Sequence, residues 1–139
     1  MLKKLLVLTC GLGFAVAACG DDDVQDMLNE YDKNAASLCD SVIDECDGYI
    51  GEDGWYDGGT FCSDLDHELS AAKTHAYSGG KDEACARAMH GLVKCLDRLS
   101  SCDELDEWAD GDSSHYPCFG AEERLESTCE GLSWWNRLL

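Results

Sequence analysis

The stretch from Cys39 to Cys62 reads CDSVIDECDGYIGEDGWYDGGTFC, and the stretch from Cys95 to Cys118 reads CLDRLSSCDELDEWADGDSSHYPC. In both stretches six residues separate the first two cysteines and fifteen separate the second from the third, so the triplet repeats at a constant offset of 56. Each triplet predicts a helix that carries two cysteines, then a polar loop, then a helix opened by the third cysteine. The sequence therefore predicts an all-α fold, a disulfide-stapled four-helix up-and-down bundle built as a duplicated helical hairpin.

Four amphipathic segments account for the predicted helices, because their apolar residues recur at steps of three and four. The segments run from Val24 to Cys46, from Thr60 as N-cap to Ala76, from Asp82 to Leu99, and from Pro117 to Leu132. The side chains of the first segment that we expect in the core are Leu28, Leu38, Val42 and Ile43.

A polar loop separates the two helices of each half. Residues 47–59 are rich in Gly and Asp, which favour turns over helix, and are predicted to form an irregular loop. The second loop contains one predicted helical turn with Asp103 as its cap. From that turn Leu105 and Trp108 are expected to point inward.

Eight cysteines follow Cys19, an even number that suits four disulfides. Cys39 and Cys46 cannot pair on one helix, because seven residues of helix span about 10 Å and a disulfide joins Cα atoms within about 7 Å. Cys85 lies near the start of the third helix and Cys129 near the end of the fourth. These positions meet at one end of an up-and-down bundle, which predicts the bridge Cys85–Cys129.

The six remaining cysteines form two equivalent triplets, and an odd number in each half requires one bridge between the halves. The favoured set closes the two loops through Cys46–Cys62 and Cys102–Cys118 and joins the halves through Cys39–Cys95. The alternative with the same symmetry pairs Cys39 with Cys62, Cys95 with Cys118, and Cys46 with Cys102.

The first eighteen residues have the pattern of an export signal. Two lysines near the start precede an apolar run from Leu5 to Val16, which is too short for a permanent membrane span. The run ends in Val16-Ala17-Ala18-Cys19, which resembles the lipobox of bacterial lipoproteins. The resemblance implies a diacylglyceryl group on the Cys19 thiol, cleavage just before it, and acylation of the new amino terminus. The alternative is an ordinary secretory signal with Cys19 as a further disulfide cysteine, but that would leave an odd thiol.

Three regions follow from these features: a lipoprotein signal peptide over residues 1–18, a lipidated tether over 19–23, and a Cys-rich helical domain over 24–139. Two or three acyl chains exceed what stable anchoring requires, so a lipid membrane is a predicted partner through acylated Cys19. Gly20 follows the cysteine in place of Asp, which under the sorting rule of enteric lipoproteins permits the outer membrane. The predicted location is the bacterial cell envelope, lipid-anchored at the periplasmic face or outer membrane.

The chain is strongly acidic, with a formal net charge of −19 that becomes −21 when the two signal lysines are removed. Nucleic acid is excluded as an expected partner, because binding to phosphates requires clustered Lys and Arg. Adhesion to anionic headgroups is disfavoured for the same reason, which leaves the lipid as the predicted membrane contact.

The sequence contains no recognisable catalytic or redox motif, so we expect a protein that is not an enzyme and has no cofactor. Cys-x-x-Cys does not occur, and the histidines are scattered. His67 and Glu68 begin like the zincin motif, but Ala71 occupies the position of the second histidine. Candidate calcium ligands, at a spacing that is not that of an EF-hand, are Asp47, Glu52, Asp53 and Asp57.

Our leading functional hypothesis is a non-enzymatic envelope lipoprotein that acts as a structural or protein-interaction module. Its candidate contact residues are Trp55 and Tyr56 in the first loop and Trp134 and Trp135 near the C-terminus. The alternative is a calcium-binding extracytoplasmic module. Through its Cys and Leu positions the mature chain also resembles small, acidic, Cys-rich lipoproteins of Gram-negative bacteria, a resemblance that implies no activity.

Overall fold

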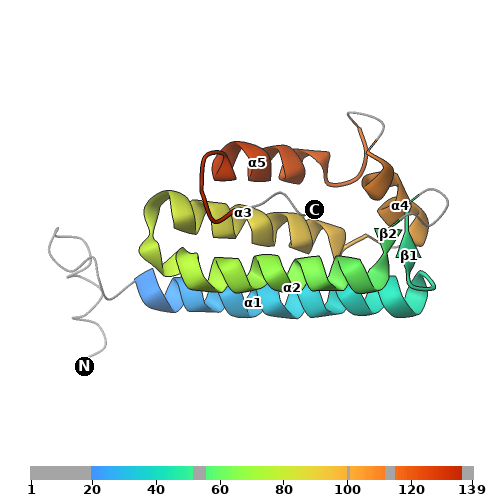
Figure 1. The fold of residues 1–139 in the computed structure, drawn as a ribbon, viewed down its shortest axis with the longest axis horizontal. Coiled ribbons are helices and arrows are strands. Elements are labelled where there is room, and N and C mark those ends of the chain that lie inside the picture. Colours follow the sequence, from blue (N-terminus) through green and yellow to red (C-terminus); the bar gives the residue numbers. More distant parts are fainter. Residues whose placement is uncertain (1–19, 52–55, 100, 112–114, 136–139) are drawn as a thin grey trace, which may run out of the picture.

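Four long helices run up and down and form the body of the protein (Figure 1). The computed structural model describes residues 20–51, 56–99, 101–111 and 115–135. The long helices are α1 (Gly20–Asp40), α2 (Gly58–His75), α3 (Gly80–Leu96) and α5 (Phe119–Cys129). A shorter helix, α4 (Cys102–Asp110), and two short strands lie at one end of the bundle. The predicted all-α, disulfide-stapled bundle is confirmed.

Helix α3 is the centre of the bundle. It packs against α1, α2 and α5, whereas α5 packs chiefly on α3 and lies above it in Figure 1. Many of the apolar side chains with least exposure come from α1, α2 and α3, and include Tyr31, Phe61, Leu65, Met89 and Leu92. The core therefore lies mainly between α1, α2 and α3. Helix α5 packs on α3, and the disulfides Cys85–Cys129 and Cys95–Cys118 link its two ends to α3.

Helix α1 begins four residues earlier than predicted. Residues 20–23 form its first turn, so the tether predicted over 19–23 is wrong for these residues. Three aspartates, Asp21, Asp22 and Asp23, occupy this turn, where carboxylates interact favourably with the positive end of the helix dipole.

The last part of the first predicted helix continues as a short π-helical turn, Ser41–Glu45. The backbone N–H of Cys46 donates to the carbonyl of Ser41 at 3.1 Å, which is an i to i+5 bond. The wider turn shifts the phase of the 3.6-residue period. Val42 is fully buried, but Ile43 is 45% exposed, so the prediction that Ile43 faces the core is wrong.

The predicted loop over residues 47–59 contains an antiparallel ribbon, so it is more regular than expected. Strand β1 (Tyr49–Ile50) pairs with β2 (Tyr56–Asp57), with Tyr49 opposite Asp57 and Ile50 opposite Tyr56. The backbone of Gly58 approaches Gly48 so closely that a Cβ at Gly58 would lie 2.9 Å from the Gly48 carbonyl oxygen. The glycines therefore permit a close backbone approach that ties the ribbon to the start of α2.

Three helix starts differ from the predicted ones. Asp57, in place of Thr60, caps α2 by accepting from the Thr60 N–H at 3.1 Å. Ser101, in place of Asp103, caps α4, which is longer than the single turn expected. Helix α5 begins after Cys118, which has a φ of 64°, and not at Pro117. The starts of α2 and α4 are set by side chains that accept a hydrogen bond from an otherwise unpaired backbone N–H. The start of α5 is set by the left-handed backbone conformation of Cys118.

The disulfides are Cys39–Cys62, Cys46–Cys102, Cys85–Cys129 and Cys95–Cys118. Cys85–Cys129 is confirmed, and the favoured bridges Cys46–Cys62, Cys102–Cys118 and Cys39–Cys95 are wrong. The other three bridges are those of the alternative set.

The level of each cysteine along the bundle explains the pairing. Cys39, in the last turn of α1, lies level with Cys62, near the start of antiparallel α2, and their Cα atoms are 5.4 Å apart. Cys46 lies beyond the end of α1 and meets Cys102 at the first residue of α4. A cysteine past the end of its helix therefore reaches the other half of the molecule and not its own hairpin.

The spacing of the disulfides reflects the internal repeat of the sequence. Two of them span 23 residues each, and the bridge between halves spans 56, which is the offset of the repeat. Asn34 and His90 are also 56 apart, and Asn34 Nδ2 lies 3.2 Å from His90 Nε2. Equivalent positions of α1 and α3 thus meet, as expected for a duplicated hairpin whose halves are related by a pseudo-two-fold axis.

Candidate interaction surfaces

The two ends of the bundle are formed by different segments of the chain. The N-terminus of α1 lies at the left end in Figure 1, and Cys19, which lies outside the described residues, immediately precedes it. The ribbon and α4 lie at the opposite, right-hand end. A helix of 21 residues is about 30 Å long, which sets the distance between the two ends. In the described part of the chain, no helix has the length and apolar character that crossing a membrane requires.

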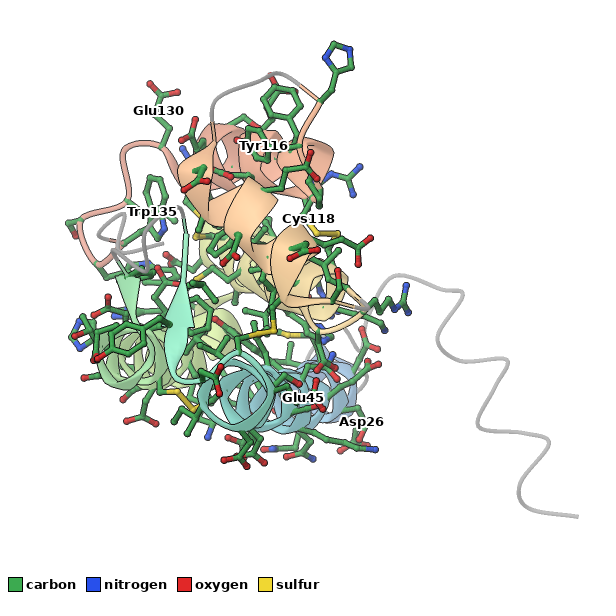
Figure 2. The ribbon with its side chains drawn as sticks, turned by 90° about the vertical axis from the view of Figure 1, so that its right-hand side faces the viewer. Asp26, Glu45, Tyr116, Cys118, Glu130 and Trp135 are labelled. Atoms are coloured by element: carbon green, nitrogen blue, oxygen red, sulfur yellow. A yellow bond between two sulfur atoms is a disulfide. The ribbon has the colours of Figure 1, made fainter. Side chains whose placement is uncertain are left out.

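The end that carries the ribbon has an exposed surface with apolar and acidic side chains. We define the loop-end surface as Ile43, Asp44, Glu45, Asp47 and Tyr49, all of which are exposed. Figure 2 views the molecule from this end and labels Glu45. Ile43 and Tyr49, at 45% and 53% exposure, are two of the three large apolar side chains that the described residues expose. Both side chains are therefore accessible to solvent.

Tyr49 was missed as a candidate contact residue, although a signal for it exists in the sequence. Successive residues of a strand point to opposite faces, so a buried Ile50 places Tyr49 outward. Tyr56 is instead half-buried: its hydroxyl donates to Asp64 Oδ2 at 2.6 Å, and its ring meets Phe61 edge-on at 5.6 Å. Its neighbours thus hold Tyr56 on the bundle. The other candidate of this loop, Trp55, lies outside the described residues.

The tryptophans near the C-terminus pack on the bundle. The Trp134 ring stacks on His75 with centroids 4.7 Å apart, and its Nε1 donates to Asp82 Oδ1 at 2.5 Å. Trp135 is half-buried and is packed against the core. These contacts give both side chains a structural role in the chain itself.

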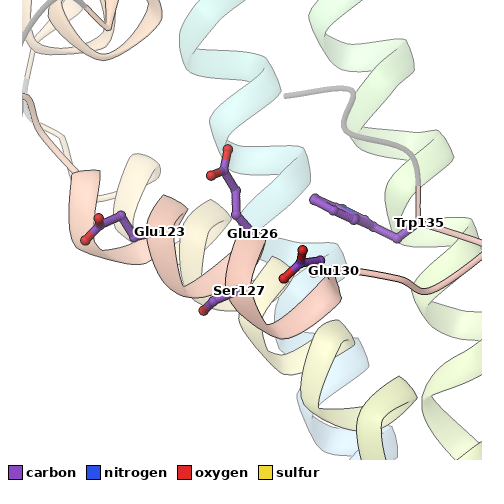
Figure 3. A pocket seen from close by; sticks show the side chains of 5 residues that line it. All are labelled: Glu123, Glu126, Ser127, Glu130 and Trp135. Atoms are coloured by element: carbon purple, nitrogen blue, oxygen red, sulfur yellow. The ribbon is translucent and has the colours of Figure 1, made fainter.

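Trp135 also forms one wall of a cleft of about 510 Å³ beside α5 (Figure 3). The opposite wall consists of Glu123, Glu126, Ser127 and Glu130, whose spacing places them on one face of the helix. Carboxylates opposite an indole ring would favour an ammonium or guanidinium group over an anion.

A second groove, of about 400 Å³, lies between the parallel helices α1 and α3. Two ion pairs cross the groove: Arg87 contacts Asp23 at 2.7 Å, and Lys94 contacts Glu30 at 2.6 Å. Exposed pairs of this kind contribute little to stability. We therefore assign this groove to helix packing.

His90 lies at the bottom of this groove and is only 7% exposed. Burial lowers its pKa from the ordinary value of 6.5, and the charges of Lys94 and Arg87 lower it further against the opposing effect of Glu30. The Asn34 amide donates to Nε2, which the protonated imidazole could not accept. The ring also stacks on Tyr31. His90 is thus held in its neutral form.

We predict a stability loss on mild acidification that depends on His90. Because its folded-state pKa is depressed, the unfolded chain binds more protons once the pH falls below 6.5, and stability is lost until the folded-state pKa is passed. The slope for one proton is at most about 1.4 kcal/mol per pH unit. Urea unfolding across this range should show a smaller slope for H90Q, whereas H67Q, at an exposed histidine, should retain the wild-type slope. Equal slopes for H90Q and wild type would contradict this role.

Tyr31 and Glu68 place polar groups inside the core, on α1 and α2 respectively. The Tyr31 hydroxyl is buried, and among the described residues no group is placed to hydrogen-bond with it. Burial, and next the nearby charge of Glu68, raise the pKa of Tyr31, so the phenol stays protonated. The phenol therefore adds polarity to the core without a matching bond.

We predict different effects on the unfolding free energy for two tyrosine-to-phenylalanine substitutions. Y31F removes a buried hydroxyl without a partner and should leave the unfolding free energy unchanged or raise it by about 1 kcal/mol. Y56F removes the bond to the Asp64 carboxylate and should lower it by about 1.5–3 kcal/mol. Denaturant unfolding of both variants measures the difference. A larger loss for Y31F than for Y56F would show that the Tyr31 hydroxyl has a stabilising partner.

The candidate calcium ligands do not come together in the described part of the chain. Asp57 accepts the capping bond of α2, and Asp47 is exposed. Glu52 and Asp53 lie outside the described residues. Within the described ranges, no three side chains of His, Cys, Asp or Glu are arranged to hold a metal ion.

Comparison with known proteins returned no significant match for this chain among protein-family models, curated proteins or solved structures.

Proposed function

We propose that this protein is a non-enzymatic lipoprotein of the bacterial cell envelope, anchored through acylated Cys19, that binds a partner protein at its loop-end surface. The lipobox residues Val16-Ala17-Ala18-Cys19 support the anchor. Four disulfides support an oxidising compartment outside the cytoplasm, since such bridges persist there and are rare in reducing compartments.

One observation carries the interaction role: the exposed apolar side chains Ile43 and Tyr49 lie at the end of the bundle opposite the start of α1. A chain anchored just before α1 would present that opposite end away from the lipid surface. The Cys46–Cys102 bridge braces the same end by joining the two halves of the molecule. A braced surface loses little conformational freedom on binding, which favours affinity.

Lipid labelling tests the anchor. Full-length protein produced in a Gram-negative host should incorporate labelled palmitate, and C19S should incorporate none. C10S is the matched control, because Cys10 lies within the predicted signal and is removed with it. Absence of label in the wild type, with an intact mass that fits ordinary signal cleavage, would refute the anchor.

Site-specific photo-crosslinking tests the interaction. A benzophenone amino acid at Tyr49 should give a discrete adduct with one envelope protein in living cells. The same group at Tyr77 should not give this adduct, although Tyr77 is 45% exposed, because it lies after α2 at the anchored end. Identical adducts from both positions, or none from Tyr49, would refute the loop-end surface as the contact.

A further inference from the structure

We propose that the loop-end surface binds a cationic segment of its partner, in which Lys or Arg side chains flank an apolar residue. This inference rests on the proposed function, because it specifies the chemistry that the same surface would recognise. It follows from the distribution of charge along the chain, from the ion pairs of the described residues, and from the apolar side chains of the surface.

The charge at this end of the molecule is mostly negative, although the exposed Arg98 follows the end of α3 there. Residues 40–57, which run from the end of α1 to the start of α2, contain seven Asp and Glu residues and no Lys or Arg. Helix α4, which packs beside β1, adds five acidic residues and no Lys or Arg. The potential at this end is therefore negative over a broad surface, and it attracts cations and repels anions.

Three basic side chains of the described residues neutralise acids elsewhere. Their ion pairs join Lys73 to Asp32, Arg87 to Asp23 and Glu83, and Lys94 to Glu30, all along the flanks of the long helices. Asp44, Glu45 and Asp47 are exposed and take part in none of these pairs. The carboxylates of the loop-end surface thus remain available to charges from outside.

Apolar side chains and a fixed backbone complete the surface. Two hydrogen bonds hold the backbone between Ile43 and Tyr49: Gly48 N–H donates to the Val42 carbonyl and Tyr49 N–H to the Cys46 carbonyl, both at 3.1 Å. An apolar residue of the partner could cover Ile43 and Tyr49 while its neighbours contact the carboxylates.

Charge complementarity decides between candidate occupants. A second copy of this chain would bring the same negative potential to the contact, which costs free energy when like charges approach. An anionic lipid or nucleic acid would be repelled for the same reason. A protein segment with Lys or Arg beside an apolar side chain matches both features of the surface.

Peptide binding to the acylated, oxidised protein in nonionic detergent tests the inference. The probe is a fluorescent peptide of sequence KKLKWKK, and the reference is EELEWEE, measured by fluorescence anisotropy. The lysine peptide should bind with an affinity that falls as salt increases, and the glutamate peptide should not bind. Equal binding of the two peptides would overturn the inference, because charge would then not select the ligand.

Two variants locate the binding on the loop-end surface. D44N/E45Q/D47N should weaken binding of the lysine peptide by roughly tenfold or more, and so should I43S/Y49S. The matched control D21N/D22N/D26N removes three exposed charges at the anchored end and should change the affinity by less than about twofold. An equal loss in the control and in D44N/E45Q/D47N, or no loss in I43S/Y49S, would overturn the inference.

The crosslinking experiment separates this inference from the function on which it rests. If the adduct from position 49 forms in wild type and persists in D44N/E45Q/D47N, the interaction role stands and the cationic partner is refuted. If wild type gives no adduct from position 49, the interaction role itself is refuted, whatever the peptide result.

Discussion

Replacing both cysteines of the bridge between the halves, as C46A/C102A, should lower the unfolding free energy by about 4 kcal/mol. The bridge spans 56 residues, and a longer closed loop removes more entropy from the unfolded chain. It is also the bridge that ties the ribbon end of the first half to α4 of the second. Denaturant unfolding under oxidising conditions measures the loss.

The control is C39A/C62A, which removes a bridge that spans 23 residues and should cost about 3 kcal/mol. Peptide mapping without reduction should first recover Cys46 linked to Cys102 in the wild-type protein. A Cys46–Cys62 peptide, or a smaller loss for C46A/C102A than for the control, would contradict the pairing on which the prediction depends.

Truncating Phe61 should have an effect of similar size, because F61A leaves a cavity where three elements meet. Phe61 is fully buried in α2, and its ring contacts Trp108 of α4 and Tyr56 of β2 edge-on, with centroids 6.1 and 5.6 Å apart. Phe-to-Ala substitutions in cores typically cost about 3–5 kcal/mol. Such a loss is a large fraction of the stability of a typical domain, about 5–15 kcal/mol. Thermal and denaturant unfolding would both report it.

F119A provides the matched control, because Phe119 is only half-buried and meets Tyr116 edge-on at the start of α5. The loss of unfolding free energy in F119A should be less than half of that in F61A. F61L conserves most of the side-chain volume and should lower the unfolding free energy by less than about 1.5 kcal/mol. An unfolding free energy of F61A within about 1 kcal/mol of the wild-type value would contradict the packing described above, because it would mean that the site collapses around the truncated side chain.

Much of the candidate surface could not be read from residue types. The hypothesis that aromatic residues of the first loop and the C-terminal end are contact residues was reasonable on composition, yet Tyr56 is bound to Asp64 and Trp134 to Asp82. Sequence shows that an aromatic residue is present but not whether the chain itself covers it. Tyr49 is exposed because β1 buries Ile50 on its other face.

The sequence by itself determined the helices, most of their buried faces and the need for one bridge between halves. A 3.6-residue period is local, so Leu28, Leu38 and Val42 could be placed in the core, and an odd triplet in each half demands a crossing bridge whatever the fold. Only the tertiary structure decided which cysteines cross and that Ile43 faces water. The disulfide pairing depends on which cysteines lie at the same height along neighbouring helices, and the exposure of Ile43 depends on the helical phase after α1. The π-helical turn and the ribbon that follows it change both, and local periodicity does not encode them.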